Sequence, residues 1–392
     1  MRVLLFTGKG GVGTSTCAVA TAATIAAAGR KTLLVATGAA GALGDVCGAA
    51  LGRQPVELAS GLYAAQIDSQ LAFERGWGEL QGLLRSAFEG AGSAPLDQAE
   101  LALLPGADEI LSLLEVQGQA ESGRWDVVVV DCGPAAHSVR MLALPATLTW
   151  YLERLLPLPR KGLRGVSPLT RAAGATSRAR AYEAIAGLHE QLRRLRDLLA
   201  DASTTSVRLV VTPDAVAVAA TLRTLTGLSL HGFDVDEVIT NRVIEPTTGE
   251  SPGPRVHRQR AQLARVDAAF SSRRVRAGPD RDVEPVGVGL LADLGRDLYG
   301  DDDPSAARTP VPAVRVDREG GTFILSLALP LVERDEVDLV RRGDDLVVTV
   351  QGQRRALTLP SALRRCTVTE AKLAGGRLSI EFAPDPDLWL RS

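Results

Sequence analysis

The residues best suited to chemistry lie in a glycine-rich loop close to the beginning of the sequence. A short apolar run, Val3–Phe6, leads into this loop, and an uncharged, alanine-rich helical pattern follows it. A loop that feeds a helix N-terminus offers backbone N–H groups and a partial positive charge to an anion, and its glycines let the backbone close on a phosphate without a Cβ in the way. The spacing therefore predicts a phosphate-binding loop formed by Gly8, Lys9, Gly10, Gly11, Val12, Gly13, Thr14, Ser15 and Thr16.

The elements that would position this loop alternate between strands and helices over the first 300 residues. Short β-branched runs bounded by Gly, Thr, Asp or Pro predict buried strands, and helical patterns lie between them. Such alternation is typical of an α/β fold whose parallel sheet is covered on both faces. The predicted strands are Val3–Phe6, Thr32–Val35, Val127–Val130, Val207–Val211 and Val238–Ile239, and the predicted helices are Ser15–Ala28, Leu71–Phe88, Asp214–Leu225 and Gln259–Phe270.

A helical insertion at about residues 146–202 interrupts the alternation. It contains a basic stretch, Arg154–Arg180, with seven Lys or Arg residues and no acidic residue. This stretch has two interpretations: a solvated surface insertion, or a cap over the sheet that contacts a partner. The helical pattern that follows has apolar residues at 3- and 4-residue spacing, namely Ile185, Leu188, Leu192, Leu195 and Leu199.

The C-terminal part of the chain is different in kind. Residues 301–312 are rich in Asp, Ala and Pro, which predicts a linker. From 313 to 392, short apolar runs are separated by turn residues, and this pattern predicts an all-β sandwich. The runs are Phe323–Leu329, Leu346–Val350, Arg355–Leu359, Cys366–Ala371 and Leu378–Phe382.

The composition excludes several classes of protein. The 392 residues include 44 Lys and Arg against 46 Asp and Glu, for a net charge of -2, so we expect no nucleic-acid partner. The four cysteines are scattered, which argues against a disulfide scaffold and a structural zinc site. The sequence shows no basic-then-apolar leader and no apolar run long enough to span a bilayer. We therefore expect a cytoplasmic protein that meets membranes only indirectly.

The glycine loop and several later segments resemble the deviant P-loop of the ArsA and tail-anchored-protein-targeting ATPases. The family pattern is GKGGVGK followed by Ser or Thr, and Lys9 matches its characteristic additional lysine. The segment Asp131–Arg140 resembles the family's second switch, DTAPTGHTLR. Further similar segments extend the resemblance over about residues 1–300, namely Thr37–Asp45, Tyr63–Asp68, Pro105–Glu109, Thr212–Asp214, Thr240–Val243 and Glu284–Val288.

This resemblance implies a P-loop NTPase domain that binds ATP and Mg²⁺. Ser15 and Asp131 would hold the Mg²⁺. Asn241 would read the adenine, and Pro285 belongs to the loop that closes over the base. Lys9 would act in trans by reaching across a dimer interface to the partner's nucleotide, although an ordinary surface lysine is the other interpretation.

The resemblance also places Asp131, Pro134 and His137 in the second switch. For His137 a core or helix-end position is the alternative to a nucleotide-sensing one. Residues 313–392 resemble the small heat-shock-protein (α-crystallin-like) domain appended to a subset of these ATPases, with Leu329–Pro360 as the most similar stretch.

Two residues depart from the family pattern. Thr14 occupies the place of the P-loop lysine, whose ammonium contacts the β- and γ-phosphates, and Gly38 replaces the aspartate taken to position the attacking water. Losing one charged hydrogen bond to a phosphate costs about 1.5–3 kcal/mol of binding. We therefore expect a degenerate ATPase that is weak or inactive alone.

The expected partners follow from the same resemblance. The chain would act as a homodimer, or as a heterodimer with an active ArsA-family ATPase, and bind or target a protein client. The alternative is a pseudo-ATPase scaffold or chaperone-like subunit that does not hydrolyse ATP. An arsenite-pump ATPase fits less well, because the sequence has no cysteine cluster.

Overall fold

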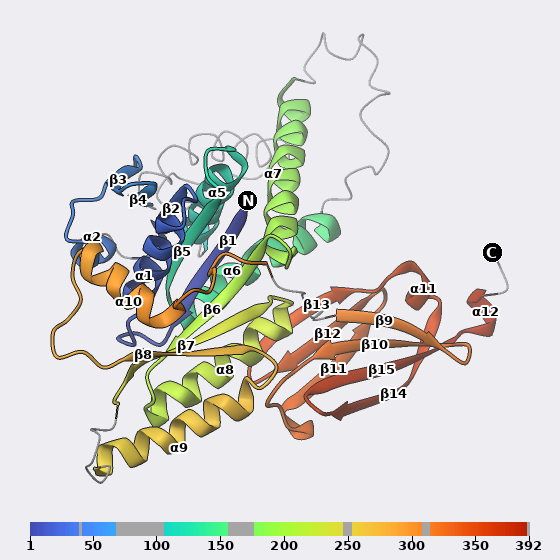
Figure 1. Ribbon diagram of the computed structural model, residues 1–392. Helices are drawn as coiled ribbons and strands as arrows, with labels where there is room; N and C mark the ends of the chain where they lie inside the picture. Colours follow the sequence, from blue (N-terminus) through green and yellow to red (C-terminus); the bar gives the residue numbers. More distant parts are fainter. Residues whose placement is uncertain (39–40, 68–105, 156–175, 246–252, 308–313, 390–392) are drawn as a thin grey trace.

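The computed structural model describes residues 1–38, 41–67, 106–155, 176–245, 253–307 and 314–389 (Figure 1). Within these residues, the first part of the chain forms an eight-stranded sheet in the order β3-β4-β2-β5-β1-β6-β7-β8. All neighbouring strands are parallel except β3 and β4. The predicted α/β fold is confirmed. The strands are β1 Arg2–Gly8, β2 Thr32–Ala36, β3 Val56–Ala59, β4 Leu62–Gln66, β5 Val127–Pro134, β6 Thr205–Val211, β7 Val235–Val243 and β8 Arg274–Pro279.

Helices cover both faces of this sheet, with α1 and α10 on one face and α6 and α7 on the other (Figure 1). Three predicted helices are confirmed as α1, α8 and α9, whereas the one predicted at 71–88 lies outside the described residues. No helix in the described ranges is both long and apolar enough to cross a membrane. The helices are α1 Thr14–Ala27, α2 Ala42–Cys47, α5 Ala107–Glu121, α6 Ala135–Leu155, α7 Thr176–Ala200, α8 Ala215–His231, α9 Pro254–Ala269 and α10 Val288–Tyr299.

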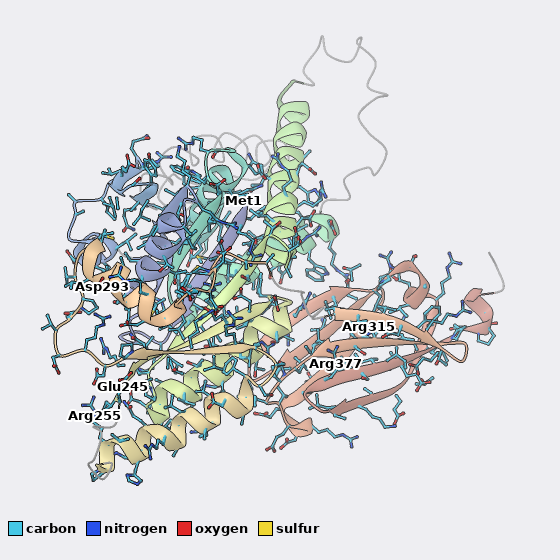
Figure 2. All side chains as sticks on the ribbon, viewed as in Figure 1. Met1, Glu245, Arg255, Asp293, Arg315 and Arg377 are labelled. Atoms are coloured by element: carbon cyan, nitrogen blue, oxygen red, sulfur yellow. The ribbon has the colours of Figure 1, made fainter. Side chains whose placement is uncertain are left out.

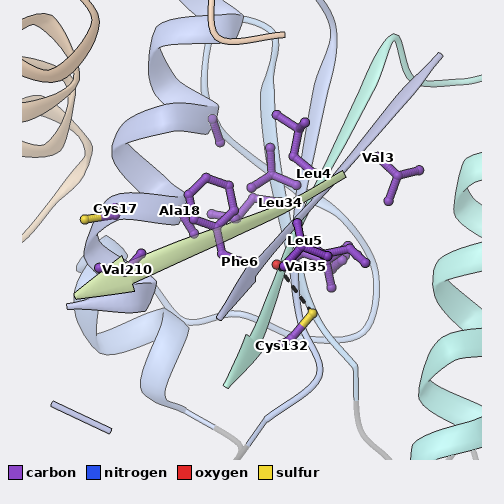
Figure 3. Packing of buried hydrophobic residues seen from close by; sticks show 14 of the residues in the cluster. Val3, Leu4, Leu5, Phe6, Cys17, Ala18, Leu34, Val35, Cys132 and Val210 are labelled. Atoms are coloured by element: carbon purple, nitrogen blue, oxygen red, sulfur yellow. Dashed lines mark hydrogen bonds between the residues drawn. The ribbon is translucent and has the colours of Figure 1, made fainter. Parts of the chain in front are cut away.

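The position of α1 between the sheet and α10 explains its small, uncharged residues. Its side chains are buried almost all round, and not along a single stripe. A Cβ at Gly295 of α10 would collide with the Thr24 hydroxyl and with the Ala20 carbonyl, so this glycine lets the two helices come close. On the sheet side, Phe6 of β1 lies beside Ala18 (Figure 3). This packing fixes the start of α1, where the glycine loop ends.

The predicted insertion at about 146–202 corresponds to the second half of α6 and to α7. α6 runs through position 146 without a break, and α7 packs against it. Leu192, Leu195 and Leu199 of α7 are buried, as their spacing predicts. Most of the basic stretch, residues 156–175, lies outside the described residues.

The C-terminal part is the predicted β-sandwich. A four-stranded sheet, β14-β15-β10-β9, faces a three-stranded sheet, β11-β12-β13, and apolar side chains from both fill the space between them. Charged side chains point outward, as Arg315 of β9 does (Figure 2). The strands are β9 Val314–Glu319, β10 Thr322–Ala328, β11 Val337–Arg342, β12 Asp345–Val350, β13 Gln353–Thr358, β14 Cys366–Ala374 and β15 Arg377–Pro384, with the short helices α11 Ser361–Arg364 and α12 Pro386–Trp389.

The sandwich is docked on the C-terminal half of α8. Leu230 of α8 belongs to the apolar cluster of the sandwich. The Arg355 guanidinium donates to the Leu230 carbonyl at 2.6 Å. A Cβ at Gly227 would lie 2.5 Å from Oε1 of Gln353, so this glycine admits the β12–β13 turn against the helix. The docking therefore holds that turn in a fixed place beside the first domain.

The beginning of the predicted linker is attached to the first domain. The buried Arg208 of β6 donates to the Pro304 carbonyl at 2.5 Å, and Ser305 is also buried. Asp236 and Glu237 of β7 lie 3.4 and 3.7 Å from the Arg208 guanidinium, so this buried charge is paired. The acidic start of the linker is thus a bound segment, whereas residues 308–313 lie outside the described part.

Candidate functional site

The glycine loop, residues 8–16, joins β1 to α1. Together with Asp131 and Asn241 it forms a cradle suited to an anion. Gly11 and Gly13 have φ values of 84° and 89°, left-handed conformations that favour glycine. A Cβ at Gly8 would lie 2.8 Å from the Val12 side chain and still closer to the Val210 carbonyl. The N-cap residue of α1 is Gly13, which has no side chain to cap the helix, so the first N–H groups stay open to a ligand.

Two residues at the end of β7 hold the loop in shape. Asn241 is 5% exposed, and its amide nitrogen donates to the Val12 carbonyl at 2.9 Å. Arg242 has a φ of 60°, and its guanidinium donates to the Gly11 carbonyl at 3.4 Å. The assignment of Asn241 to adenine stays a prediction, whereas its contact with the loop is a role that sequence reasoning missed. Arg242 was also missed, although it is the next residue of the same motif.

Ser15 and Asp131 meet at the base of the cradle. The Ser15 hydroxyl donates to Oδ2 of Asp131 at 2.5 Å, and the Gly133 N–H donates to Oδ1 at 3.2 Å. Burial raises the pKa of Asp131, and these two hydrogen bonds act in the opposite direction. A hydroxyl and a carboxylate beside a phosphate cradle are the hard oxygen ligands that Mg²⁺ prefers. The predicted Mg²⁺ ligands are therefore placed together, and their chemistry fits the ion.

A buried hydroxyl pair links the loop to the segment after β5. Thr7 of β1 lies with its Oγ1 2.9 Å from the Gly133 carbonyl and 2.8 Å from the Ser138 hydroxyl. Both residues are almost fully buried. Neither was singled out from the sequence, and the only signal was that each belongs to, or borders, a recognised motif. The pair therefore links the Gly133 carbonyl to β1 by hydrogen bonds.

Gly38 belongs to the segment Thr37–Asp45, which resembles the family's first switch, and it faces Gly133 in the segment that resembles the second switch. A Cβ at Gly38 would lie 4.0 Å from the Gly133 Cα, which is ordinary contact. Gln66 of β4 fixes Gly38 by donating to its carbonyl at 3.2 Å. The Thr37 N–H donates to the Asp131 carbonyl at 3.0 Å. Among the described residues, no atom therefore blocks a Cβ at position 38.

Thr14 and Lys9 lie at opposite ends of the cradle. Thr14 is the half-buried first residue of α1, and its hydroxyl oxygen lies 2.9 Å from the position of a Gly8 Cβ. The Lys9 side chain is exposed, and its own carbonyl accepts a hydrogen bond from the Val12 N–H at 3.2 Å. Within the part of the chain that the structure describes, Lys9 has no ion pair.

Two other predicted site residues have their neighbours elsewhere. His137, in the first turn of α6, lies 3.7 Å from Glu109 of α5 through its Nδ1. Pro285 lies in the segment before α10, which contacts the end of α2 through a 2.9 Å hydrogen bond from the Gly287 N–H to the Val46 carbonyl. Pro134 is exposed at the end of β5, next to the cradle. The structure therefore brings together residues 8–16, Asp131, Pro134 and Asn241.

The four cysteines are buried and unpaired. Burial raises the pKa of Cys17 to about 12 and that of Cys47 to about 11. Protonated thiols of this kind are poor nucleophiles and poor metal ligands. Within the described ranges, no three His, Cys, Asp or Glu side chains are grouped to hold a metal ion.

Two family profiles match most of the chain. The anion-transporting ATPase profile of the ArsA type matches residues 1–300, and the profile of the HSP20-like domain found in ArsA matches residues 320–382. An uncharacterized protein of Streptomyces coelicolor is 38% identical over 406 aligned positions, which cover all of both chains. These matches confirm the predicted resemblance to the ArsA family and to its HSP20-like domain.

Two further relatives carry functional names. A protein of Chlorobaculum tepidum, provisionally named arsenical pump-driving ATPase, is 30% identical over 391 positions, covering 97% of this chain and 96% of that protein. The ATPase GET3 of Podospora anserina is 26% identical over 279 positions, covering 68% of this chain and 80% of that protein.

Proposed function

Because the chain belongs to the ArsA family of anion-transporting ATPases, we propose that it binds ATP and Mg²⁺ at the glycine loop, hydrolyses ATP slowly, and couples nucleotide binding to a protein client. The observation that carries this proposal is the meeting of the open α1 N-terminus, Ser15 and Asp131. Ser15 and Asp131 would hold Mg²⁺, which offsets charge on the phosphate oxygens when it is bound.

Slow hydrolysis is inferred from two missing groups. Position 14 offers a threonine hydroxyl in place of an ammonium, and position 38 has no side chain to orient a water. The ammonium would stabilise charge that develops in the transition state, and the aspartate would position the attacking water, so their joint loss lowers turnover more than binding. The second candidate, a pseudo-ATPase scaffold without hydrolysis, is favoured by the same two positions and differs only in turnover.

Action as a dimer is inferred from Lys9. Its side chain is exposed at the rim of the cradle and has no ion pair within the described residues, so it is free to reach a second chain. In a heterodimer with an active family member, Lys9 would supply charge to the partner's ATP in the manner of an arginine finger. A homodimer would place two such lysines across the interface.

Client binding is assigned to the sandwich and to the helices α6 and α7. The HSP20-like match covers the sandwich, and a targeting-type ATPase, GET3, is among the relatives. Nucleotide binding at the cradle would bias these elements, because α6 begins directly after the Asp131–Pro134 segment.

Calorimetry with ATP and Mg²⁺ tests the central claim. Wild-type protein should bind, and Asp131→Asn or Ser15→Ala should weaken the Mg²⁺-dependent part of the affinity about tenfold or more. Asp267→Asn, which neutralises an exposed carboxylate of α9, is the matched control and should bind as the wild type does. No heat at millimolar ATP would refute nucleotide binding, and phosphate release as fast as in an intact family member would refute slow hydrolysis.

A further inference from the structure

A second cavity lies beside the glycine loop, between the first domain and the sandwich. Its volume is about 910 Å³, and its walls come from the tip of the loop, from α6, from α8 and from the β12–β13 turn. The cavity does not include Ser15, Asp131 or Asn241, which form the nucleotide cradle. It is therefore a separate space that touches the cradle only at its rim.

The charged residues described in the lining of this cavity are all basic. Lys9, Arg140, Arg223 and Arg354 line it, and its lining includes no Asp or Glu from the described part of the chain. None of these four cations forms an ion pair with another described residue; the Arg140 guanidinium only donates to the Ala136 carbonyl of its own helix at 3.3 Å. Like charges that gather around one space repel each other, and an anion between them removes that cost. The lining thus favours a negatively charged occupant.

The sandwich contributes to this cavity because its docking fixes the β12–β13 turn. Arg354 lies at the start of β13, directly after that turn, between Gln353, which abuts Gly227, and Arg355, which donates to the Leu230 carbonyl. The Oε1 atom of Gln353 is buried and has no hydrogen-bond partner among the described residues. Arg354 is therefore held opposite Arg140 of α6 and Arg223 of α8 by contacts that do not involve its own side chain.

We propose that this interdomain cavity binds a small phosphorylated anion, held by Arg140, Arg223 and Arg354. Guanidinium groups present planar, paired N–H donors that match phosphate oxygens, and they stay charged at every physiological pH. Apolar residues of α6, such as Val139 and Ala143, form the remaining wall and exclude water from one side. The site exists only while the sandwich is docked, so its ligand would stabilise the docked arrangement.

Titration of the full-length chain with sodium tripolyphosphate tests this site. The buffer has low salt, contains EDTA, and holds ADP in excess so that the cradle is occupied first. Wild-type protein should bind the probe, and R354Q and R223Q should each weaken binding about tenfold or more. R365Q removes an exposed arginine of the same sandwich outside the cavity and should bind as the wild type does. Equal affinity in all four proteins, or no binding by the wild type, would overturn the proposal.

Two further arms identify the source and the class of the anion. ADP titrated alone into R354Q distinguishes the sources: unchanged ADP affinity indicates a free phosphorylated ligand, and reduced affinity indicates the phosphate tail of a nucleotide. Arginine-dependent binding of a hexaglutamate peptide without binding of tripolyphosphate would overturn the phosphate assignment. If the wild-type protein bound tripolyphosphate but did not bind ATP·Mg²⁺, the proposed function would be refuted and the proposal for this cavity would be supported.

Discussion

Replacing Thr14 with lysine tests whether one missing ammonium limits nucleotide affinity. Thr14 is the first residue of α1 and only half-buried, so a longer side chain can leave the loop without entering the core. One charge-assisted hydrogen bond contributes about 1.5–3 kcal/mol, which corresponds to about a 10- to 160-fold lower Kd for ATP. We expect Thr14→Lys to gain affinity within this range.

The measurement is calorimetry with ATP and Mg²⁺ combined with an assay of phosphate release. Thr14→Met is the matched control, because it adds a similar length without the charge and should leave the affinity close to that of the wild type. Gly38→Asp is the second substitution: among the described residues, a Cβ there meets no atom closer than the Gly133 Cα at 4.0 Å, so the start of the side chain is not blocked. Turnover should rise most in the double variant, since charge stabilisation and water positioning act on the same step.

Two results would refute this reasoning. If Thr14→Met raised the affinity as much as Thr14→Lys, the effect would come from packing and not from charge. If Thr14→Lys alone restored the turnover of an intact family member, another group would already orient the water, and Gly38 would not limit hydrolysis.

Three other changes test the framework of the molecule. Asn241→Ala leaves the Val12 carbonyl without its 2.9 Å donor, so the free energy of unfolding in urea should fall by about 1–3 kcal/mol; an unchanged midpoint would show that water replaces the amide. Gly227→Leu would drive a side chain into Gln353. It should lower the melting temperature of the full chain and expose the sandwich core to a hydrophobic dye. An unaltered melting curve would mean that the β12–β13 turn moves away from α8 at little cost. Burial, assisted by the neighbouring Arg355, lowers the pKa of His231 from 6.5 to about 4. Between these pH values the unfolded chain binds more protons than the folded chain. The free energy of unfolding should therefore fall by up to about 3 kcal/mol as the pH drops from 6.5 to 4. His231→Gln should lose less stability over the same range. If urea unfolding showed the same loss of stability between pH 7 and pH 4.5 in the wild type and in His231→Gln, this origin would be contradicted.

The elements closest to the chemistry were predictable because their signals are local. β1 and β5 are continuous apolar runs, as strands buried on both faces must be, and the glycines at 11 and 13 carry the left-handed conformations that the loop needs. Asp131 was identified because the segment Asp131–Arg140, which follows an apolar strand, resembles the family's second switch. In each case one short stretch of sequence contained the whole pattern.

The contacts that shape the site were not predictable, because they join residues far apart in the chain. Nothing near Asn241 indicates that its amide will pair with the Val12 carbonyl, since that contact depends on the strand order of the sheet. Likewise, Gly227 is an unremarked glycine inside a helix until the β12–β13 turn is placed against it. Such pairings are decided by tertiary packing, which a single sequence does not display.

The sandwich contacts the first domain at two helices, α8 and α6, and these contacts decide how the two parts can respond to each other. On α8, the fully buried Leu230 and the 2.6 Å bond from Arg355 form a desolvated contact. On α6, the 2.8 Å ion pair joins an Arg154 side chain that is 57% exposed to an Asp345 side chain that is only 7% exposed. α6 begins immediately after the Asp131–Pro134 segment of the cradle. A shift of α6 that broke this pair would leave the nearly buried Asp345 carboxylate with the Thr358 hydroxyl as its donor, so the sandwich is held on α6 as well as on α8.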